Sequence, residues 1–379
     1  MNEPSEITTP LGSGRAPADS RPGAPESDAR PDETYETAGH GRRARRDGEP
    51  EIGPEWATLQ RLALRQLDRF VGFEPKVLRG DSARAIHDIR VASRRLQELL
   101  DLLYPAPRLR GIQKLRRKIR RSRRALSEVR NCDVSLARID KTLGRKRTAR
   151  REAWEVVRDY LAERRAKTAA KALRRFSKLN LAAFYVRLKE YLVSEASEMN
   201  APGAAHSASD ASPQVIAFPD ERAGQRLQRR LAESLEREWQ AFEARLAESH
   251  RDRSADLLHR ARIATKRVRY LVEVAHQFQV AGSGEALAGL RRLQRCLGDW
   301  HDLEVLEQRM LEMVARQEFL RQRLSTAMEV ERLVVRGRAA KRRLEEKYLL
   351  MTLDAGEAGS GEYQRLAHWV AGFLSSPAA

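Results

Sequence analysis

Residues 86–100 read Ile-His-Asp-Ile-Arg-Val-Ala-Ser-Arg-Arg-Leu-Gln-Glu-Leu-Leu, and residues 258–272 read Leu-His-Arg-Ala-Arg-Ile-Ala-Thr-Lys-Arg-Val-Arg-Tyr-Leu-Val. Both follow the order apolar-His-x-x-Arg-aliphatic-Ala-Ser/Thr-basic-Arg, which aligns His87 with His259. A second pair of similar segments follows at nearly the same offset in each half: Leu126–Val134 and Leu297–Val305. Two matches in register indicate that the chain contains one helical unit twice, related by duplication.

Each repeated segment would place cations beside an apolar seam if it formed a helix. At about 100° per residue, His87, Arg90 and Arg94 fall within about 60° of one another. The adjoining stripe should face a core and consists of Ile86, Ile89, Leu96, Leu100 and Leu103. The second segment repeats the polar row with His259, Arg262, Lys266 and Arg269. One such helix alone would be read more simply as solvated surface around a buried histidine. Its repetition in register favours a binding site.

The segment after the first repeat is dominated by positive charge. From Arg108 to Arg124, ten of 17 residues are Lys or Arg. Too few acids lie nearby for i,i+4 pairing to neutralise this helix, so we expect a bound anion, or distance from other charges, to offset its self-repulsion. The counterpart in the second half is weaker and contains Arg291, Arg292 and Arg295. The predicted core seam of this helix consists of Ile112, Leu115, Ile119, Leu126 and Val129. The predicted basic stripe on the opposite face consists of Lys114, Arg117, Arg121 and Arg124.

The net charge of the chain is unevenly distributed. The 379 residues include 72 Lys plus Arg and 53 Asp plus Glu, which gives a formal net charge of +19. Residues 1–50 sum to −3, residues 51–193 to +21 and residues 194–379 to +1. An excess of this size predicts a polyanionic partner. Its confinement to one half argues against a generally adhesive surface.

The predicted fold is all-α. Aromatic residues make up only 6% of the chain, and no proline occurs between Pro107 and Pro202 or between Pro219 and Pro377, which suits long helices. The predicted helices are 55–73, 82–103, 109–130, 133–170, 176–193, 221–248, 254–280, 284–299, 302–350 and 361–374. The predicted domains are a disordered tail (1–50), a first helical bundle (51–193), a flexible linker (194–220), a second bundle (221–350), and a C-terminal linker with a short helix (351–379).

Composition also argues against several classes of protein. Two cysteines, Cys132 and Cys296, cannot form a disulfide framework or a structural zinc site. No apolar run approaches the ~20 residues of a membrane span, and the N-terminus shows no secretory signal. We therefore expect a cytoplasmic protein without a metal site, a cofactor or membrane attachment. The sequence leaves its oligomeric state open.

The two histidine-containing helices resemble the hallmark of the CHAD domain, the conserved histidine α-helical domain. The segments Leu126–Val134 and Leu297–Val305 are similar to the family's Leu-Gly-x-x-x-Asp elements. The resemblance covers roughly residues 55–350. It implies two pseudo-symmetric four-helix bundles around a basic central channel that binds inorganic polyphosphate, and an association with polyphosphate granules. The chain departs from the family pattern at Gln97, Ser127 and Asn131.

The candidate polyphosphate-binding residues combine the repeated rows with the basic helices. They are His87, Arg90, Arg94, Arg95, Lys114, Arg117, Lys118, Arg121, Arg124, His259, Arg262, Lys266, Arg267, Arg269 and Arg292. We predict no catalytic residues, because no nucleophile motif accompanies the histidines. Four carboxylates could serve a phosphoanhydride hydrolase as magnesium ligands, but they are more simply interpreted as helix caps or arginine partners: Asp133, Asp299, Asp302 and Glu304.

A nucleic-acid-binding helical protein is the main alternative. Any phosphate backbone can bind a basic surface through counterion release. Proteins that bind single strands usually add aromatic side chains on which bases stack, yet residues 76–151 contain one aromatic residue, Tyr104. The sequence therefore favours polyphosphate and predicts weaker binding of nucleic acid.

Overall fold

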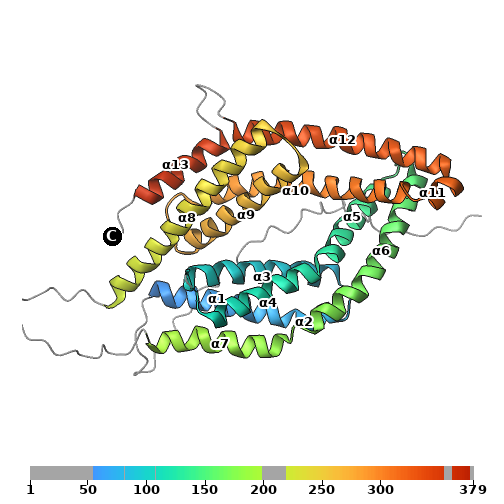
Figure 1. Cartoon of the computed structure of the whole chain (residues 1–379). Helices are drawn as coiled ribbons and strands as arrows, with labels where there is room; N and C mark the ends of the chain where they lie inside the picture. Colours follow the sequence, from blue (N-terminus) through green and yellow to red (C-terminus); the bar gives the residue numbers. More distant parts are fainter. Residues whose placement is uncertain (1–53, 81, 107, 199–218, 354–360, 376–379) are drawn as a thin grey trace, which may run out of the picture. The chain divides into compact units, whose positions relative to one another are not determined.

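Helices form all the regular secondary structure in the part of the chain that the structure, a computed structural model, describes: residues 54–80, 82–106, 108–198, 219–353 and 361–375. The all-α prediction is confirmed (Figure 1). The helices are α1 (Pro54–Gly72), α2 (Glu74–Leu78), α3 (Ala83–Leu103), α4 (Arg110–Ala125), α5 (Ser127–Leu143), α6 (Arg151–Ser177), α7 (Leu181–Glu198), α8 (Pro219–Arg251), α9 (Ala255–Gln277), α10 (Ser283–Val314), α11 (Gln317–Gln322), α12 (Leu324–Thr352) and α13 (Glu362–Ser375).

The first repeated segment forms α3 with the predicted orientation. The Ser82 hydroxyl accepts a hydrogen bond from the Ala85 backbone N–H at 3.0 Å and caps the start of the helix. All five residues of the predicted seam, from Ile86 to Leu103, are buried. Burial of one such side chain contributes about 1.5–3 kcal/mol to folding stability. The seam therefore fixes which face of α3 lies against the core and which face carries the polar row.

The helices of the two halves follow one another in a similar order. In the first half α1 packs along α3, and α5 packs along α6. In the second half α8 packs along α9, and α10 packs along α12. One hydrophobic core contains residues of both halves, such as Leu96 of α3 and Val268 of α9. The predicted twofold relation between the halves remains a prediction.

The predicted helices 109–130 and 133–170 have the wrong boundaries. The chain bends at Leu126 (φ −92°, ψ 1°), where α4 ends and α5 begins. A turn then separates α5 from α6, because residues 144–150 supply no large apolar side chain to continue the seam. Within this turn the Thr148 hydroxyl donates to the carbonyls of Thr142 at 2.7 Å and Arg145 at 3.1 Å.

The predicted helices 284–299 and 302–350 are also wrong in extent. Helix α10 continues past Trp300, because Leu306, Met310 and Met313 extend its buried seam. The chain reverses after Val314 through the short helix α11, and α12 then runs back along α10. The reversal places Leu333 in a common core with Leu306 and Met310.

This second core joins the halves of the chain. It contains Ile139, Val157 and Leu161 from the α5–α6 pair, and Leu306 and Leu333 from the α10–α12 pair. Separate bundles would not require such contacts. The far ends of the two halves are therefore held together by apolar packing.

Several predictions concern residues that the structure does not describe. The predicted tail (1–50) lies outside the described ranges, as does most of the predicted linker, from 199 to 218. Helix α7 extends five residues into that linker, to Glu198, and α13 (Glu362–Ser375) lies where the short C-terminal helix was predicted. None of the helices in the described part combines the length and apolarity that crossing a membrane requires.

Candidate anion-binding site

The two repeated helices, α3 and α9, lie against each other. The Arg94 guanidinium on α3 donates a hydrogen bond to the Tyr270 hydroxyl on α9 at 3.3 Å. Beside this contact, Arg95 of α3 lies 3.7 Å from the carboxylate of Glu273 on α9. The duplicated motif therefore meets its own copy across the interface between the halves.

Basic side chains converge at this interface. Four come from the first half and four from the second, and together we call them the cation cluster: Arg90, Arg94, Arg123 and Arg130, with His259, Arg262, Lys266 and His301. They belong to five helices, α3, α4, α5, α9 and α10. Each of the pairs Arg90/Arg262 and Arg94/Lys266 occupies equivalent positions in the repeat, three and seven residues after the histidine.

Burial and mutual repulsion lower the pKa values of most of these groups, whereas the interaction with Tyr270 raises the pKa of Arg94. Burial, followed by the charges of Arg94, Arg123, Arg130 and Arg262, lowers the pKa of Arg90 to about 10. The pKa of Lys266 is held well below its usual range, first by burial and then by arginines from both halves. Close cations in a partly dehydrated place destabilise one another, so a bound anion would relieve this repulsion.

Two histidines lie at one side of the cluster. The ring centroids of His259 and His301 are 4.9 Å apart. Burial, then the charges of Arg262, His259 and Lys266, lowers the pKa of His301 to about 3. Burial also lowers the pKa of His259, as do Arg262 and Lys266. Both rings are therefore neutral near pH 7 in the protein without an anion.

Hydrogen bonds to polar neighbours hold the arginines of the first half. Arg90 donates to the Arg123 carbonyl at 2.5 Å and to the Ser127 hydroxyl at 3.1 Å. Arg123 donates to the Gln97 side-chain carbonyl at 2.5 Å. Gln97 and Ser127 are two of the positions at which the chain departs from the motif it resembles, and here they orient cluster arginines.

Two buried nitrogen atoms of the second half have no hydrogen-bond partner among the described residues. The Arg262 Nε and the His259 Nδ1 are buried, and no described residue forms a hydrogen bond with either atom. Buried polar groups are seldom left unsatisfied in folded proteins. A ligand with oxygen acceptors would satisfy these donors.

An acidic group lies beside the cluster. Burial, followed by the nearby charges of Asp101 and Glu238, raises the pKa of Glu98 to about 7. Arg123 and Arg267 oppose this shift. The Glu98 carboxyl is therefore about half protonated at neutral pH, and its negative charge disappears as the pH falls.

Three members of the cluster were not predicted from the sequence: Arg123, Arg130 and His301. A signal for two of them was present, because Arg130 and His301 are both the fifth residue of the second repeated element. Arg123 could not be separated from its basic neighbours on α4 without knowing which face of that helix turns inward.

Two predicted site residues form buried ion pairs with one carboxylate. Arg95 and Arg269 both approach Glu273, and Arg269 also donates to the Gln294 side-chain carbonyl at 2.6 Å. All three charged side chains are less than a tenth exposed. These ion pairs join α3 to α9 beside the cation cluster.

The remaining predicted residues lie at the edge of the cluster or on other surfaces. Arg267 is exposed and lies 3.4 Å from Glu238, Arg292 is exposed and pairs with Glu362, and Lys118 donates to the Asn180 carbonyl at 3.1 Å. His87 is half-buried on α3 and is not a member of the cation cluster. The predicted α4 stripe is fully exposed: Lys114, Arg117, Arg121 and Arg124.

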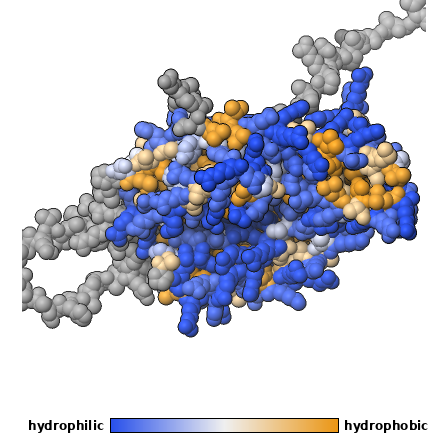
Figure 2. Space-filling view, turned by 45° about the horizontal axis from the view of Figure 1, so that its top comes forward, coloured by the Kyte–Doolittle hydropathy of each residue, from blue (hydrophilic) through white to orange (hydrophobic). Residues whose placement is uncertain are grey.

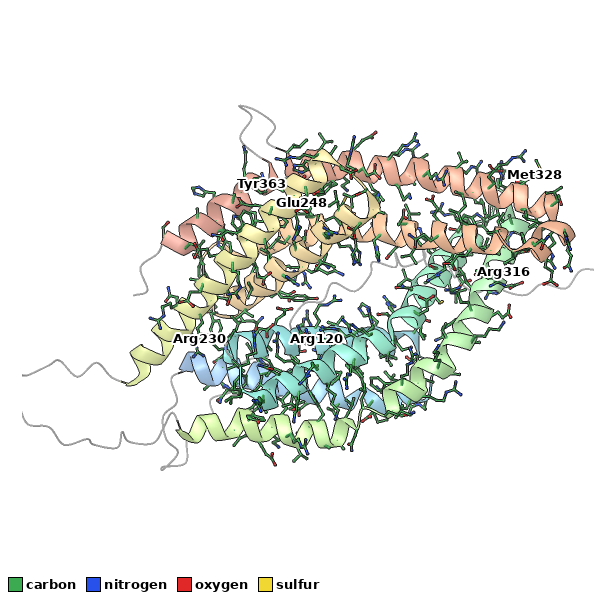
Figure 3. All side chains as sticks on the ribbon, viewed as in Figure 1. Arg120, Arg230, Glu248, Arg316, Met328 and Tyr363 are labelled. Carbon is green, nitrogen blue, oxygen red and sulfur yellow. The ribbon has the colours of Figure 1, made fainter. Side chains whose placement is uncertain are left out.

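A different face of α4 turns toward the interface. Arg116 donates to Asp101 of α3 at 2.5 Å, and the charge of Arg120 acts on Arg123. Figure 3 shows Arg120 on the side of α4 that is turned toward α8 and α9. Figure 2 shows hydrophilic residues around a hollow on one face of the molecule. The predicted central channel remains a prediction.

Comparisons with known proteins give a consistent result. The family model of the CHAD domain matches residues 61–311. The structure is similar to the crystal structure of the CHAD domain from the plant Ricinus communis, with a TM-score of 0.51, 22% sequence identity, and coverage of 82% of this chain and 96% of that chain. At this identity the likeness concerns the fold. No curated protein matches the chain.

Proposed function

Because the chain belongs to the CHAD domain family, we propose that it binds inorganic polyphosphate at the cation cluster. The observation that carries this proposal is the meeting of α3 and α9, which gathers cations from both copies of the motif. Guanidinium groups form charge-assisted hydrogen bonds with phosphate oxygens. A chain of phosphates can contact many of these cations from both halves at once.

We propose a binding role without catalysis. Carboxylates that could hold a catalytic metal are engaged in ion pairs: Asp133 lies 2.5 Å from Arg165, and Glu304 lies 2.5 Å from Lys341. Hydrolysis of a phosphoanhydride generally needs metal-held carboxylates or a positioned nucleophile. The proposed location is the cytoplasm, in association with polyphosphate granules.

The central test of this proposal is selectivity. At moderate salt, polyphosphate should bind more tightly than single-stranded DNA or RNA with the same number of phosphates, because the basic segment 76–151 contains one aromatic residue, Tyr104, on which bases could stack. Binding can be measured by competition against one labelled polyphosphate. Affinity for either ligand should fall steeply as salt rises. Equal or tighter binding of nucleic acid would instead support the alternative function, a nucleic-acid-binding protein.

Polyphosphate binding should also take up protons near pH 7, where Glu98 titrates. A bound anion opposes the effects that lower the pKa of Lys266 and His301, so binding raises the pKa of both groups. Protonation of Glu98 near pH 7 removes a competing negative charge. Affinity should therefore rise as the pH falls. Calorimetry in two buffers that differ in ionisation enthalpy measures the uptake.

The control for this pH effect is the variant Lys266→Met combined with His301→Gln, in which the proton uptake on binding should be smaller than in the unmodified protein. Release of protons on binding would contradict a cluster whose pKa values are lowered by repulsion.

The stability of the fold should depend on pH in the opposite direction to the affinity. The stability contributed by neutral His301 is present above about pH 6.5 and is lost as the pH falls toward 3.

A further inference from the structure

A second recess lies on the other side of α10 from the cation cluster. It has a volume of about 300 Å³ and is formed by α5, the turn before α6, α6, α10 and α12. Four arginines belong to its lining: Arg138, Arg145, Arg147 and Arg336. Its lining also includes the apolar side chains of Trp154, Leu303, Leu306 and Met310. The volume is at the lower end of the range for small-molecule sites.

The arginines of this recess are not neutralised by the protein. Within the described residues, none of the four guanidinium groups lies within 4.0 Å of a carboxylate or donates a hydrogen bond. The carboxylate in the lining, Glu307, is itself held by Arg338 at 2.7 Å and by Lys341 at 2.6 Å. Since that carboxylate is already paired, the recess presents a net positive charge to a ligand.

The recess and the cation cluster occupy different faces of α10. At about 100° per residue, Leu303, Leu306 and Met310 lie about 140–180° around the helix from His301. His301 faces Arg262 and Lys266, whereas the other three residues line the recess. Because α10 separates the two places, one can be changed while the other is left intact.

The chemistry of the recess differs from that of the cation cluster. Its apolar floor gives no advantage to a bare phosphate chain, but it would bury a flat ring. Among the described residues none accepts a hydrogen bond from the Trp154 indole N–H, which leaves that donor and the indole ring for a ligand. Aromatic rings stack on indole and guanidinium planes, and guanidinium groups bind phosphate.

We propose that this recess binds a small molecule in which a heteroaromatic ring carries a phosphate, with the size of a mononucleotide. The ring lies against Trp154 and the apolar floor, and the phosphate lies among the arginines at the rim. This site is independent of the proposed polyphosphate site. It is built from both halves of the chain, so its ligand would bind across the packing of α5–α6 against α10–α12.

The first test compares adenosine 5′-monophosphate with ribose 5-phosphate, which carries the same phosphate without the ring. Binding to the full chain is measured by calorimetry at moderate salt. We expect adenosine 5′-monophosphate to bind at least about tenfold more tightly, since its base adds a stacking contact that ribose 5-phosphate lacks. Equal affinity for the two ligands would overturn the proposal, because contact between the ring and the apolar lining of the recess would then add nothing to the affinity.

Gly337 allows the recess to be filled without disturbing the fold. It lies in α12 and lines the recess, and a Cβ atom added there would meet no other atom within 4 Å. Gly337→Leu should lower the affinity for adenosine 5′-monophosphate at least about tenfold. The helix should persist, because Leu favours a helix more than Gly does. The matched control is Gly372→Leu in α13, where an added Cβ also meets no atom within 4 Å.

The two sites should respond separately to substitution. Gly337→Leu should leave polyphosphate affinity unchanged, and charge reversal at Arg94 and Lys266 should leave binding of adenosine 5′-monophosphate unchanged. If Gly337→Leu has no effect on nucleotide affinity, or if reversal at the cluster abolishes it, the nucleotide binds elsewhere and the proposal is wrong. Failure of polyphosphate binding alone would overturn the proposed function and leave this site standing.

Discussion

Charge reversal at Arg94 and Lys266 together, by Arg94→Glu and Lys266→Glu, should weaken polyphosphate binding by at least about tenfold. These residues occupy equivalent positions in the two copies of the motif and repel each other electrostatically across the interface. One contact between a guanidinium and a phosphate contributes roughly 1.5–3 kcal/mol. The reversed charges would also repel the ligand. Titration with one polyphosphate of defined length measures the loss.

The fold should tolerate this double change. Lys266 is surrounded by Arg262, Arg94, Arg269 and Arg90, so a carboxylate in its place removes repulsion in the free protein. Far-ultraviolet circular dichroism should be unchanged, while the melting temperature should fall only slightly, because Arg94→Glu also removes the hydrogen bond to Tyr270. A large drop in melting temperature would mean that lost binding reflects unfolding, in which case Lys266→Met provides the milder test of the cluster.

Two controls separate the cluster from general electrostatics. Lys171→Glu with Arg175→Glu makes the same change in net charge on the exposed surface of α6. Neutralisation of the tail arginines at positions 42, 43, 45 and 46 removes four charges. Both controls should change affinity only slightly. If the tail variant loses binding and the cluster variant keeps it, the binding site lies in the tail.

The sequence allowed the fold class and the centre of the site to be predicted, because both depend on a repeated pattern. The periodicity around Ile86 and Leu100 predicted α3 and its buried face, and the repeat placed Arg94 and Lys266 in equivalent positions. The structure brings these two residues to one interface. A local pattern was sufficient here because the helix geometry alone fixes which side chains lie beside the apolar seam.

Other parts of the site depended on packing that the sequence does not reveal. Helix α4 has cations on more than one face, and its apolar seam leaves open which polar face turns toward α9. The structure turns Arg123 inward and leaves Arg121 exposed. Likewise, the chain reversal between α10 and α12 follows from tertiary contacts of Leu306 with Leu333, which no local pattern specifies.

The Glu273→Gln substitution should lower the free energy of unfolding by about 3 kcal/mol or more. Glu273 lies between two buried arginines, Arg95 on α3 and Arg269 on α9. Removal of one partner of a buried pair typically costs about 3–5 kcal/mol, because the remaining charge stays dehydrated without compensation. Glutamine has nearly the same volume, so a cavity would not explain the loss. Urea unfolding followed by circular dichroism measures the change.

The matched control is Glu238→Gln, which removes a carboxylate from an ion pair at the surface. Glu238 lies 3.4 Å from Arg267, and the two side chains are 23% and 55% exposed, so water reaches the pair and its loss should change stability by no more than about 1 kcal/mol. Glu273 acts between the same helices that carry the cation cluster. Its removal should therefore weaken polyphosphate binding only to the extent that the protein unfolds, and ligand should restore part of the lost stability. A loss for Glu273→Gln no larger than that for Glu238→Gln would show that the buried pair does not hold α3 against α9.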